Sequence, residues 1–283
     1  MTALDPRLGL SGRTLRACVD DHRAALVGYL PLGFPDVAGS IEAMRALCEG
    51  SDGLGVDLVE VGLPYTDPVL DGLAIQHAGT RALERGVRTH DVFGAVEAVA
   101  ATGKQAVVMT YWNLVERYGP QAFARDLASA GGCGLITPDL TPDEAGEWIV
   151  ASDEFGLDRI FLVSPSSTDA RIASTTAACR GWVYATSVMG VTGTRTTTSS
   201  AAPGLVAKVR EAAPDLPVGV GLGVSNGDQA ADVARYADAV IVGSAFVKLL
   251  IENDRSGSDD LSSLRSLVDD LAHGVRSPST SRS

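Results

Sequence analysis

Short apolar runs alternate with amphipathic segments along most of this chain. The runs are rich in β-branched residues and predict buried strands at 25–29, 56–61, 105–109, 134–137, 159–163, 182–186, 217–221 and 238–242. Apolar residues at helical spacing predict helices at 12–23, 39–48, 76–85, 92–101, 121–130, 142–154, 168–179, 203–212 and 226–236. Strict alternation of strand and helix indicates a parallel sheet. Eight such units within 283 residues favour an α/β fold of the closed (β/α)8 TIM-barrel type.

The domain organisation follows from the same pattern. We expect one barrel domain over residues 1–276, with an extra N-terminal helix, a short helix after Gly243 and a disordered tail at 277–283. An open, doubly wound sheet is the alternative, and it needs a glycine-rich nucleotide-binding turn after the first strand. The segment at 29–35, Tyr-Leu-Pro-Leu-Gly-Phe-Pro, is unlike such a turn.

Charge and composition argue against several classes of function. A net charge of -12 argues against binding to nucleic acid or to an anionic membrane. The first residues show no secretory pattern, and the most apolar segment, 237–251, is too short to span a bilayer. We therefore expect a cytoplasmic protein. The four cysteines and four histidines lack the spacing of a metal site, so no metal is predicted.

Two carboxylates lie near the end of the second predicted strand. Glu60 is the one acid in the apolar run at 58–61, and Asp71 ends the Pro/Asp/Gly-rich loop that follows. An acid/base pair at the mouth of a barrel would need this arrangement. A glutamate held by an arginine, beside an aspartate that caps the next helix, explains the local pattern equally well. The ends of other strands add Tyr111 and Tyr184 to the same mouth.

Glycines follow the last strands. Gly193, Gly223 and Gly243, with Gly190, Gly221 and Ser244, predict loops whose N–H groups surround a phosphate near the start of a short helix. A single glycine more often just ends a strand tightly, but three such loops at one mouth favour phosphate.

Lysines are few. Lys104 is at the start of a strand, Lys208 is on an outer helix and Lys248 is on the short helix after Gly243. None is well placed for an imine with a substrate. Acid/base residues alone can break a carbon–carbon bond if the substrate accepts the electrons.

Residues 60–76, Glu-Val-Gly-Leu-Pro-Tyr-Thr-Asp-Pro-Val-Leu-Asp-Gly-Leu-Ala-Ile-Gln, resemble the signature of the tryptophan synthase alpha chain family. Segments 191–193, 221–224 and 243–244 resemble its phosphate-binding loops. The resemblance implies a lyase that cleaves indole-3-glycerol phosphate to indole and glyceraldehyde 3-phosphate. Glu60 would then shuttle protons, Asp71 would hold the indole N–H and Tyr184 would orient the substrate or Glu60.

The resemblance also implies the surroundings of the site. It suggests an indole pocket lined by Tyr29, Ile75, Met109, Ile136, Leu162 and Leu222. It implies a tryptophan synthase beta chain as partner in an α2β2 heterotetramer, with indole passing to that chain. Asp67, Asn113 and Asp139 would face the partner. No cofactor is expected in this chain, because pyridoxal phosphate would belong to the beta partner.

Some features depart from the family pattern or leave alternatives open. Phe34, Leu73 and Leu222 stand where the family often has Asp, Pro and Phe. The polar segment 187–202 suits a mobile lid or a plain connector. Another phosphate-binding barrel enzyme of tryptophan or histidine biosynthesis and a non-catalytic activating subunit are the alternative functions.

Overall fold

A single parallel sheet forms the centre of the molecule. The computed structural model describes residues 6–186 and 201–277. All paired strands are parallel, in the order β5-β4-β3-β2-β1-β9-β8-β7-β6. The strands are β1 (Ala25–Pro31), β2 (Leu58–Gly62), β3 (Gln105–Met109), β4 (Gly134–Ile136), β5 (Asp158–Ile160), β6 (Leu162–Val163), β7 (Val183–Thr186), β8 (Val218–Gly221) and β9 (Ala239–Val242).

The two outer members of this order, β5 and β6, are halves of one interrupted strand. Only Phe161 separates them, and β5 pairs with β4 whereas β6 pairs with β7. The sheet is therefore an eight-stranded barrel whose fifth strand is split, which confirms the predicted TIM-barrel fold. The predicted single strand at 159–163 is corrected to these two short pieces.

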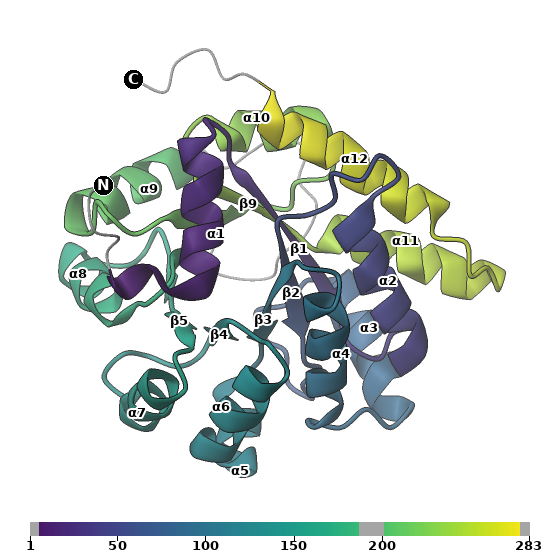
Figure 1. Cartoon of the computed structure of the whole chain (residues 1–283), viewed down its shortest axis with the longest axis horizontal. Helices are drawn as coiled ribbons and strands as arrows, with labels where there is room; N and C mark the ends of the chain where they lie inside the picture. The colour runs from purple at the N-terminus through teal and green to yellow at the C-terminus, as the bar shows by residue number, and fades with distance from the viewer. Residues whose placement is uncertain (1–5, 187–200, 278–283) are drawn as a thin grey trace.

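Helices cover the outside of the strands (Figure 1). They are the 3-10 helix η1 (Pro6–Leu8) and the α-helices α1 (Gly9–Asp20), α2 (Val37–Glu49), α3 (Leu73–Glu84), α4 (Asp91–Ala100), α5 (Trp112–Tyr118), α6 (Pro120–Ser129), α7 (Gly146–Glu154), α8 (Asp169–Ala178), α9 (Ala202–Ala212), α10 (Gly227–Ala234), α11 (Ser244–Ser256) and α12 (Ser262–Arg276). Sequence patterning missed α5. It also began α7 too early, at residue 142, because turns occupy residues 141–145.

Two apolar cores lie on either side of the strands. Residues that point outward pack under the helices, and inward-pointing ones such as Val27, Leu58 and Val107 form a separate cluster inside the barrel. Leu15 and Cys18 of α1 join the inner cluster. Helix α1 therefore covers the N-terminal end of the barrel, which leaves the C-terminal strand ends for chemistry.

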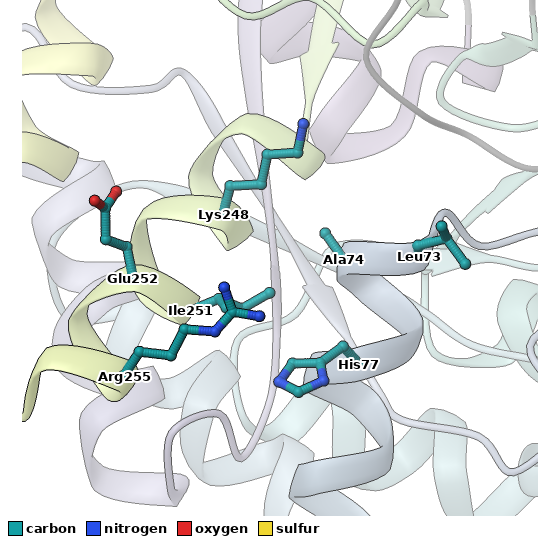
Figure 2. A pocket seen from close by; sticks show the side chains of 7 residues that line it. All are labelled: Leu73, Ala74, His77, Lys248, Ile251, Glu252 and Arg255. Carbon is teal, nitrogen blue, oxygen red and sulfur yellow. The ribbon is translucent and has the colours of Figure 1, made fainter.

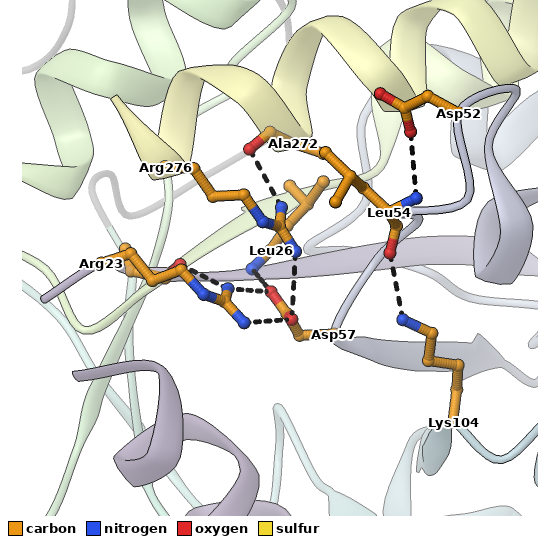
Figure 3. Close-up of polar contacts among 9 residues, drawn as sticks. Arg23, Leu26, Asp52, Leu54, Asp57, Lys104, Ala272 and Arg276 are labelled. Carbon is orange, nitrogen blue, oxygen red and sulfur yellow. Dashed lines mark hydrogen bonds and ion pairs between the residues drawn. The ribbon is translucent and has the colours of Figure 1, made fainter. Parts of the chain in front are cut away.

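An ion-paired aspartate, Asp57, holds several segments together at the N-terminal end of the barrel (Figure 3). Arg23 donates hydrogen bonds of 2.8 Å to both carboxylate oxygens of Asp57, and the Leu26 N–H donates a third of 2.8 Å. Burial would raise the pKa of Asp57, but these bonds outweigh it and lower the pKa. Arg276 of α12 lies 3.5 Å from the same carboxylate, so Asp57 connects the first two strands to the last helix.

No helix within the described ranges is both long and apolar enough to cross a membrane.

Candidate active site

Glu60 is a buried carboxyl in the middle of β2, two residues before the strand ends at Gly62. Alternation along the strand turns it inward, and it pairs in register with Tyr29 of β1. It is 1% exposed, and its Oε2 has no hydrogen-bond partner within residues 6–186 and 201–277. Burial, and then the nearby charge of Asp71, raise its pKa to about 8. The carboxyl is therefore protonated at neutral pH, and no arginine in the described residues holds it as an anion.

Asp71 lies in the loop after β2, half-buried and close enough to influence Glu60. Burial raises its pKa to about 6, so it is mostly ionised at neutral pH. Gly72 is the N-cap residue of α3, and as a glycine it has no side chain with which to cap the helix. Among the described residues, no hydrogen bond contributes to the pKa shift of Asp71, so its carboxylate accepts none from the first N–H groups of that helix and is left for another role.

Backbone contacts fix the Asp71 peptide. The Gln76 side chain donates a 2.8 Å hydrogen bond to the Asp71 carbonyl, and the Asp71 N–H donates to the Pro68 carbonyl at 3.1 Å. Sequence patterning did not identify this role of Gln76. The only available signal was an amide side chain one turn into the helix that follows the loop.

Tyr29 and Tyr184 fill spaces left by glycines at the strand ends. A Cβ atom on Gly62 would lie 2.4 Å from the Tyr29 hydroxyl, and one on Gly221 would lie 2.7 Å from the Tyr184 hydroxyl. Burial, followed by Asp71 and then Glu60, raises the pKa of Tyr29 well above its usual value. Burial raises the pKa of Tyr184 likewise, with Glu60 acting before Asp71. The two phenols and two carboxyls thus form one electrostatic cluster.

Three of the predicted phosphate residues, Gly223, Gly243 and Ser244, lie just beyond the ends of β8 and β9. Gly243 is the N-cap of α11 and Ser244 is its first residue, so this helix begins at the carboxyl end of β9. The first N–H groups of a helix have no partner within it and favour an anion. Gly223, after β8, has a positive φ of 71°. Gly193 and the rest of the predicted lid up to residue 200 lie outside the described residues.

Gly243 has a second reason to be glycine. A Cβ atom there would lie 2.9 Å from Cδ1 of the Tyr29 ring. Tyr29 is therefore wedged between Gly62 and Gly243, and it links the end of β2 to the start of α11. A bulky residue at Gly243 would displace Tyr29 as well as any anion.

The six apolar residues predicted for an indole pocket do not all have the same surroundings. Ile136 is fully buried inside the barrel, and Met109 and Leu162 pack against that inner cluster. The remaining three are half-buried and contact the outer core: Tyr29, Ile75 and Leu222. Half-burial suits the walls of a site that opens to solvent.

The predicted partner-facing residues lie on neighbouring strand-end loops. Asp139 accepts hydrogen bonds of 3.0 and 3.2 Å from the Trp112 N–H, and Asn113 donates one of 3.2 Å to the Tyr65 hydroxyl. Asp67 is exposed and accepts a bond of 2.7 Å from Thr66 within its own loop. Tyr65 and Asn113, rather than Asp67, therefore connect the loop after β2 to α5.

None of the three lysines contributes to the pKa shifts of Glu60 and Asp71. Lys104 Nζ donates to the Leu54 carbonyl near the N-terminal strand ends, and Lys208 pairs with Asp169 on the outside. Lys248 lines an open groove of about 580 Å³ between α3 and α11, together with Leu73, Ala74, His77, Ile251, Glu252 and Arg255 (Figure 2). Neither Glu60 nor Asp71 lines this groove, so it is distinct from the strand-end site. In the described part of the chain, no three His, Cys, Asp or Glu residues are grouped to hold a metal ion.

Comparison with known proteins gives a consistent result. A family model described as tryptophan synthase alpha chain matches residues 15–276. The sequence is 57% identical over 276 residues to the tryptophan synthase alpha chain of Mycobacterium avium (strain 104), covering 98% of each. A structure of Mycobacterium tuberculosis tryptophan synthase has a TM-score of 0.88 and 56% identity, covering 95% of this chain and 98% of that one. The tryptophan synthase complex from Pyrococcus furiosus has a TM-score of 0.79 and 27% identity, with coverage of 89% and 98%.

Proposed function

Because the chain belongs to the tryptophan synthase alpha chain family, we propose that it cleaves indole-3-glycerol phosphate to indole and glyceraldehyde 3-phosphate with Glu60 and Asp71 as its acid/base pair. The observation that carries the proposal is the pair itself. Two carboxyls within electrostatic reach have pKa values of about 8 and about 6, so one is protonated while the other is ionised at neutral pH. Such separation is how two carboxyls take different catalytic roles.

The proposed reaction begins with protonation. Glu60 gives its proton to C3 of the indole, and the ring becomes an iminium whose positive charge extends to the N–H. Asp71, as an anion, accepts a hydrogen bond from this N–H and stabilises the charge. The developing charge exists in the transition state but not in the substrate, so the interaction accelerates the reaction.

Bond cleavage follows. Glu60, now a carboxylate, takes the proton from the hydroxyl on the carbon attached to C3. The electrons of the carbon–carbon bond move into the iminium, which restores indole, and the hydroxyl carbon becomes the aldehyde of glyceraldehyde 3-phosphate. Glu60 ends the cycle protonated, so protons and electrons balance without a lysine imine.

The substrate's two ends fit two sets of residues. We propose that the first N–H groups of α11, at Ser244, and the loops with Gly193, Gly223 and Gly243 bind the phosphate. The indole ring would contact Tyr29, Met109, Leu162 and Leu222, together with Ile75 and Ile136. Tyr184, coupled electrostatically to Glu60, would orient the substrate or that carboxyl.

A beta chain is the proposed partner, in an α2β2 complex that receives the indole. Pyridoxal phosphate would belong to that partner and takes no part in the steps above. Asp67, Asn113 and Asp139 would form part of the contact. We also propose a cytoplasmic location, as expected for an enzyme of amino-acid biosynthesis.

Indole release from indole-3-glycerol phosphate, measured with and without a beta chain, tests the proposal. Glu60→Gln and Asp71→Asn should each lower turnover by about a hundredfold or more, as for loss of an acid/base group. Glu97→Gln, the same change at an exposed position of α4, should have no effect. A wild-type chain that stimulates a beta chain but releases no indole would instead be a non-catalytic subunit.

Borohydride tests the absence of an imine separately. Added during turnover, it should leave no substrate fragment bound to the chain, because Lys104 and Lys208 have partners elsewhere and no lysine influences the pKa of Glu60 or Asp71. A reduced adduct on Lys248 would contradict the proposed steps without changing the family assignment.

A further inference from the structure

We propose that Tyr111 is a positioning residue that orients Asp71 through the backbone of the loop after β2. The Leu70 N–H donates a 3.1 Å hydrogen bond to the Tyr111 hydroxyl, and Leu70 immediately precedes Asp71. The inference rests on the proposed function, because it gives Tyr111 a role in the reaction assigned to Asp71. It extends that function to a residue on another strand end.

Tyr111 is itself held firmly. It is 6% exposed, is separated from the end of β3 by Thr110 and is the N-cap residue of α5. Its ring stacks on Tyr65 with centroids 4.9 Å apart and an interplanar angle of 25°. The next residue, Trp112, donates its N–H to Asp139 beyond β4. Two neighbouring strand ends therefore fix the position of the Tyr111 hydroxyl.

The contacts around Asp71 show what this hydroxyl adds. Gln76 of α3 holds the Asp71 carbonyl, and Tyr111 at the N-cap of α5 holds the N–H of the preceding residue. The backbone around Asp71 is thus fixed on both sides by different elements, while no hydrogen bond among the described residues contributes to the pKa shift of its carboxylate. An anion that must align with one N–H of a planar ring gains most from such pre-organisation, since small misplacements cost large factors in rate.

Tyr111 does not need to touch the substrate to act in this way. Burial, with smaller contributions from Asp71, Asp139 and Tyr65, raises the pKa of Tyr111 to about 12, although the Leu70 hydrogen bond acts to lower it. The phenol therefore keeps its proton wherever the enzyme works. Its effect on Asp71 is geometric and does not involve proton transfer.

The variant Tyr111→Phe removes the acceptor for Leu70 and keeps the stacked ring, so the fold should survive with a small change in Tm. We expect kcat to fall about tenfold or more with KM within about threefold, because Asp71 acts on transition-state charge. In an Asp71→Asn background the same substitution should lower kcat by less than about twofold, since the group it positions is gone. Equal losses in both backgrounds would overturn the inference.

Tyr118→Phe is the matched control. Tyr118 ends α5, and its hydroxyl donates a 2.7 Å hydrogen bond to Asp126, away from the carboxyl pair. This variant should leave kcat unchanged. A tenfold loss of kcat in Tyr118→Phe as well would mean that removing either tyrosine hydroxyl lowers activity. The effect of Tyr111→Phe would then not be specific to the contact with Leu70.

Amide hydrogen exchange separates this inference from the proposed function. The Leu70 amide should exchange about tenfold faster in Tyr111→Phe than in the wild type and be unchanged in Tyr118→Phe. If the wild type releases no indole, the proposed function fails while exchange at Leu70 still reports on the contact. Unchanged exchange at Leu70 in Tyr111→Phe would overturn the positioning role even in an active enzyme.

Discussion

Glu60 and Asp71 carry the same functional group in two environments. Glu60 is enclosed in the barrel, and its Oε2 has no hydrogen-bond partner among the described residues, whereas Asp71 is half-buried in a loop. Burial raises the pKa of both carboxyls, and further for Glu60 because it is more deeply buried, with the negative charge of Asp71 adding to its shift. At the scale of single residues, the depth of burial therefore distinguishes the proton donor from the anion.

The pH dependence of kcat/KM should follow from this difference. Activity requires ionised Asp71 and protonated Glu60, so it should rise through about pH 6, fall through about pH 8 and be highest near pH 7. The two limbs belong to the coupled pair rather than to either carboxyl alone. An initial-rate profile that stays flat between pH 5 and 9 would contradict this assignment.

The pH dependence of thermal stability should report on the protonation of Glu60 independently of catalytic activity. Its folded pKa of about 8 exceeds the ordinary value of 4.5, so the folded state binds the proton more tightly. The stability due to this group is complete below pH 4.5 and is lost as pH rises toward 8. Glu60→Gln cannot ionise, so its Tm should exceed that of the wild type by about 2 °C or more at pH 8.5. The difference should shrink at pH 5, and a difference independent of pH would contradict the prediction.

At the scale of elements, the shape of the site depends on how the end of β2 and the start of α11 pack around the ring of Tyr29. The Tyr29 ring occupies the space that a side chain at Gly62 or Gly243 would take. Glycine at these positions is therefore a packing requirement as well as a route for an anion to approach the backbone. Substitution of Gly243 cannot test phosphate binding, because it also displaces Tyr29 from Glu60.

Ser244→Asp tests the anion site without that side effect. A carboxylate in the first turn of α11 should favour the helix through its dipole but repel the substrate's phosphate. We expect KM for indole-3-glycerol phosphate to rise about tenfold or more, and Tm to fall because Ser244 is buried and the new charge must be desolvated. Ser263→Asp, at an exposed position in the first turn of α12, is the control and should leave KM unchanged. An unchanged KM in Ser244→Asp would place the phosphate elsewhere.

At the scale of the whole molecule, the site opens beside an exposed apolar surface. Val69 is 71% exposed and Leu73 is 79% exposed, and both flank Asp71 in the loop and first turn after β2. Removal of apolar side chains from water is favourable, so a partner that covers Val69 and Leu73 would form a more stable complex. The same loop carries Tyr65, whose partner Asn113 is also predicted to face the beta chain.

Val69→Asp should therefore weaken binding of a beta chain by about tenfold or more, because a charge would be buried at the contact. Indole release by the isolated chain should change much less. Val150→Asp, the same substitution at a valine of α7 that is 61% exposed, is the control. Titration of the beta chain by calorimetry measures both affinities, and equal affinities for Val69→Asp and wild type would exclude this surface.

Much of the fold was determined by local pattern, because strand and helix periods differ and their alternation admits few architectures. The eight β/α units, the location of Glu60 on the second strand and that of Asp71 in the loop after it were predicted from the sequence. Residue patterning did not reveal that strand five is interrupted at Phe161, because its two halves pair with different strands. It also did not reveal that α5 begins directly after Tyr111, where the Trp112 N–H donates to Asp139, a residue far along the chain. Only tertiary structure could decide between the two interpretations of the carboxyls. Burial and neighbours determine a pKa, and the residues that enclose Glu60 and hold Asp71 come from strands and loops far apart in the chain.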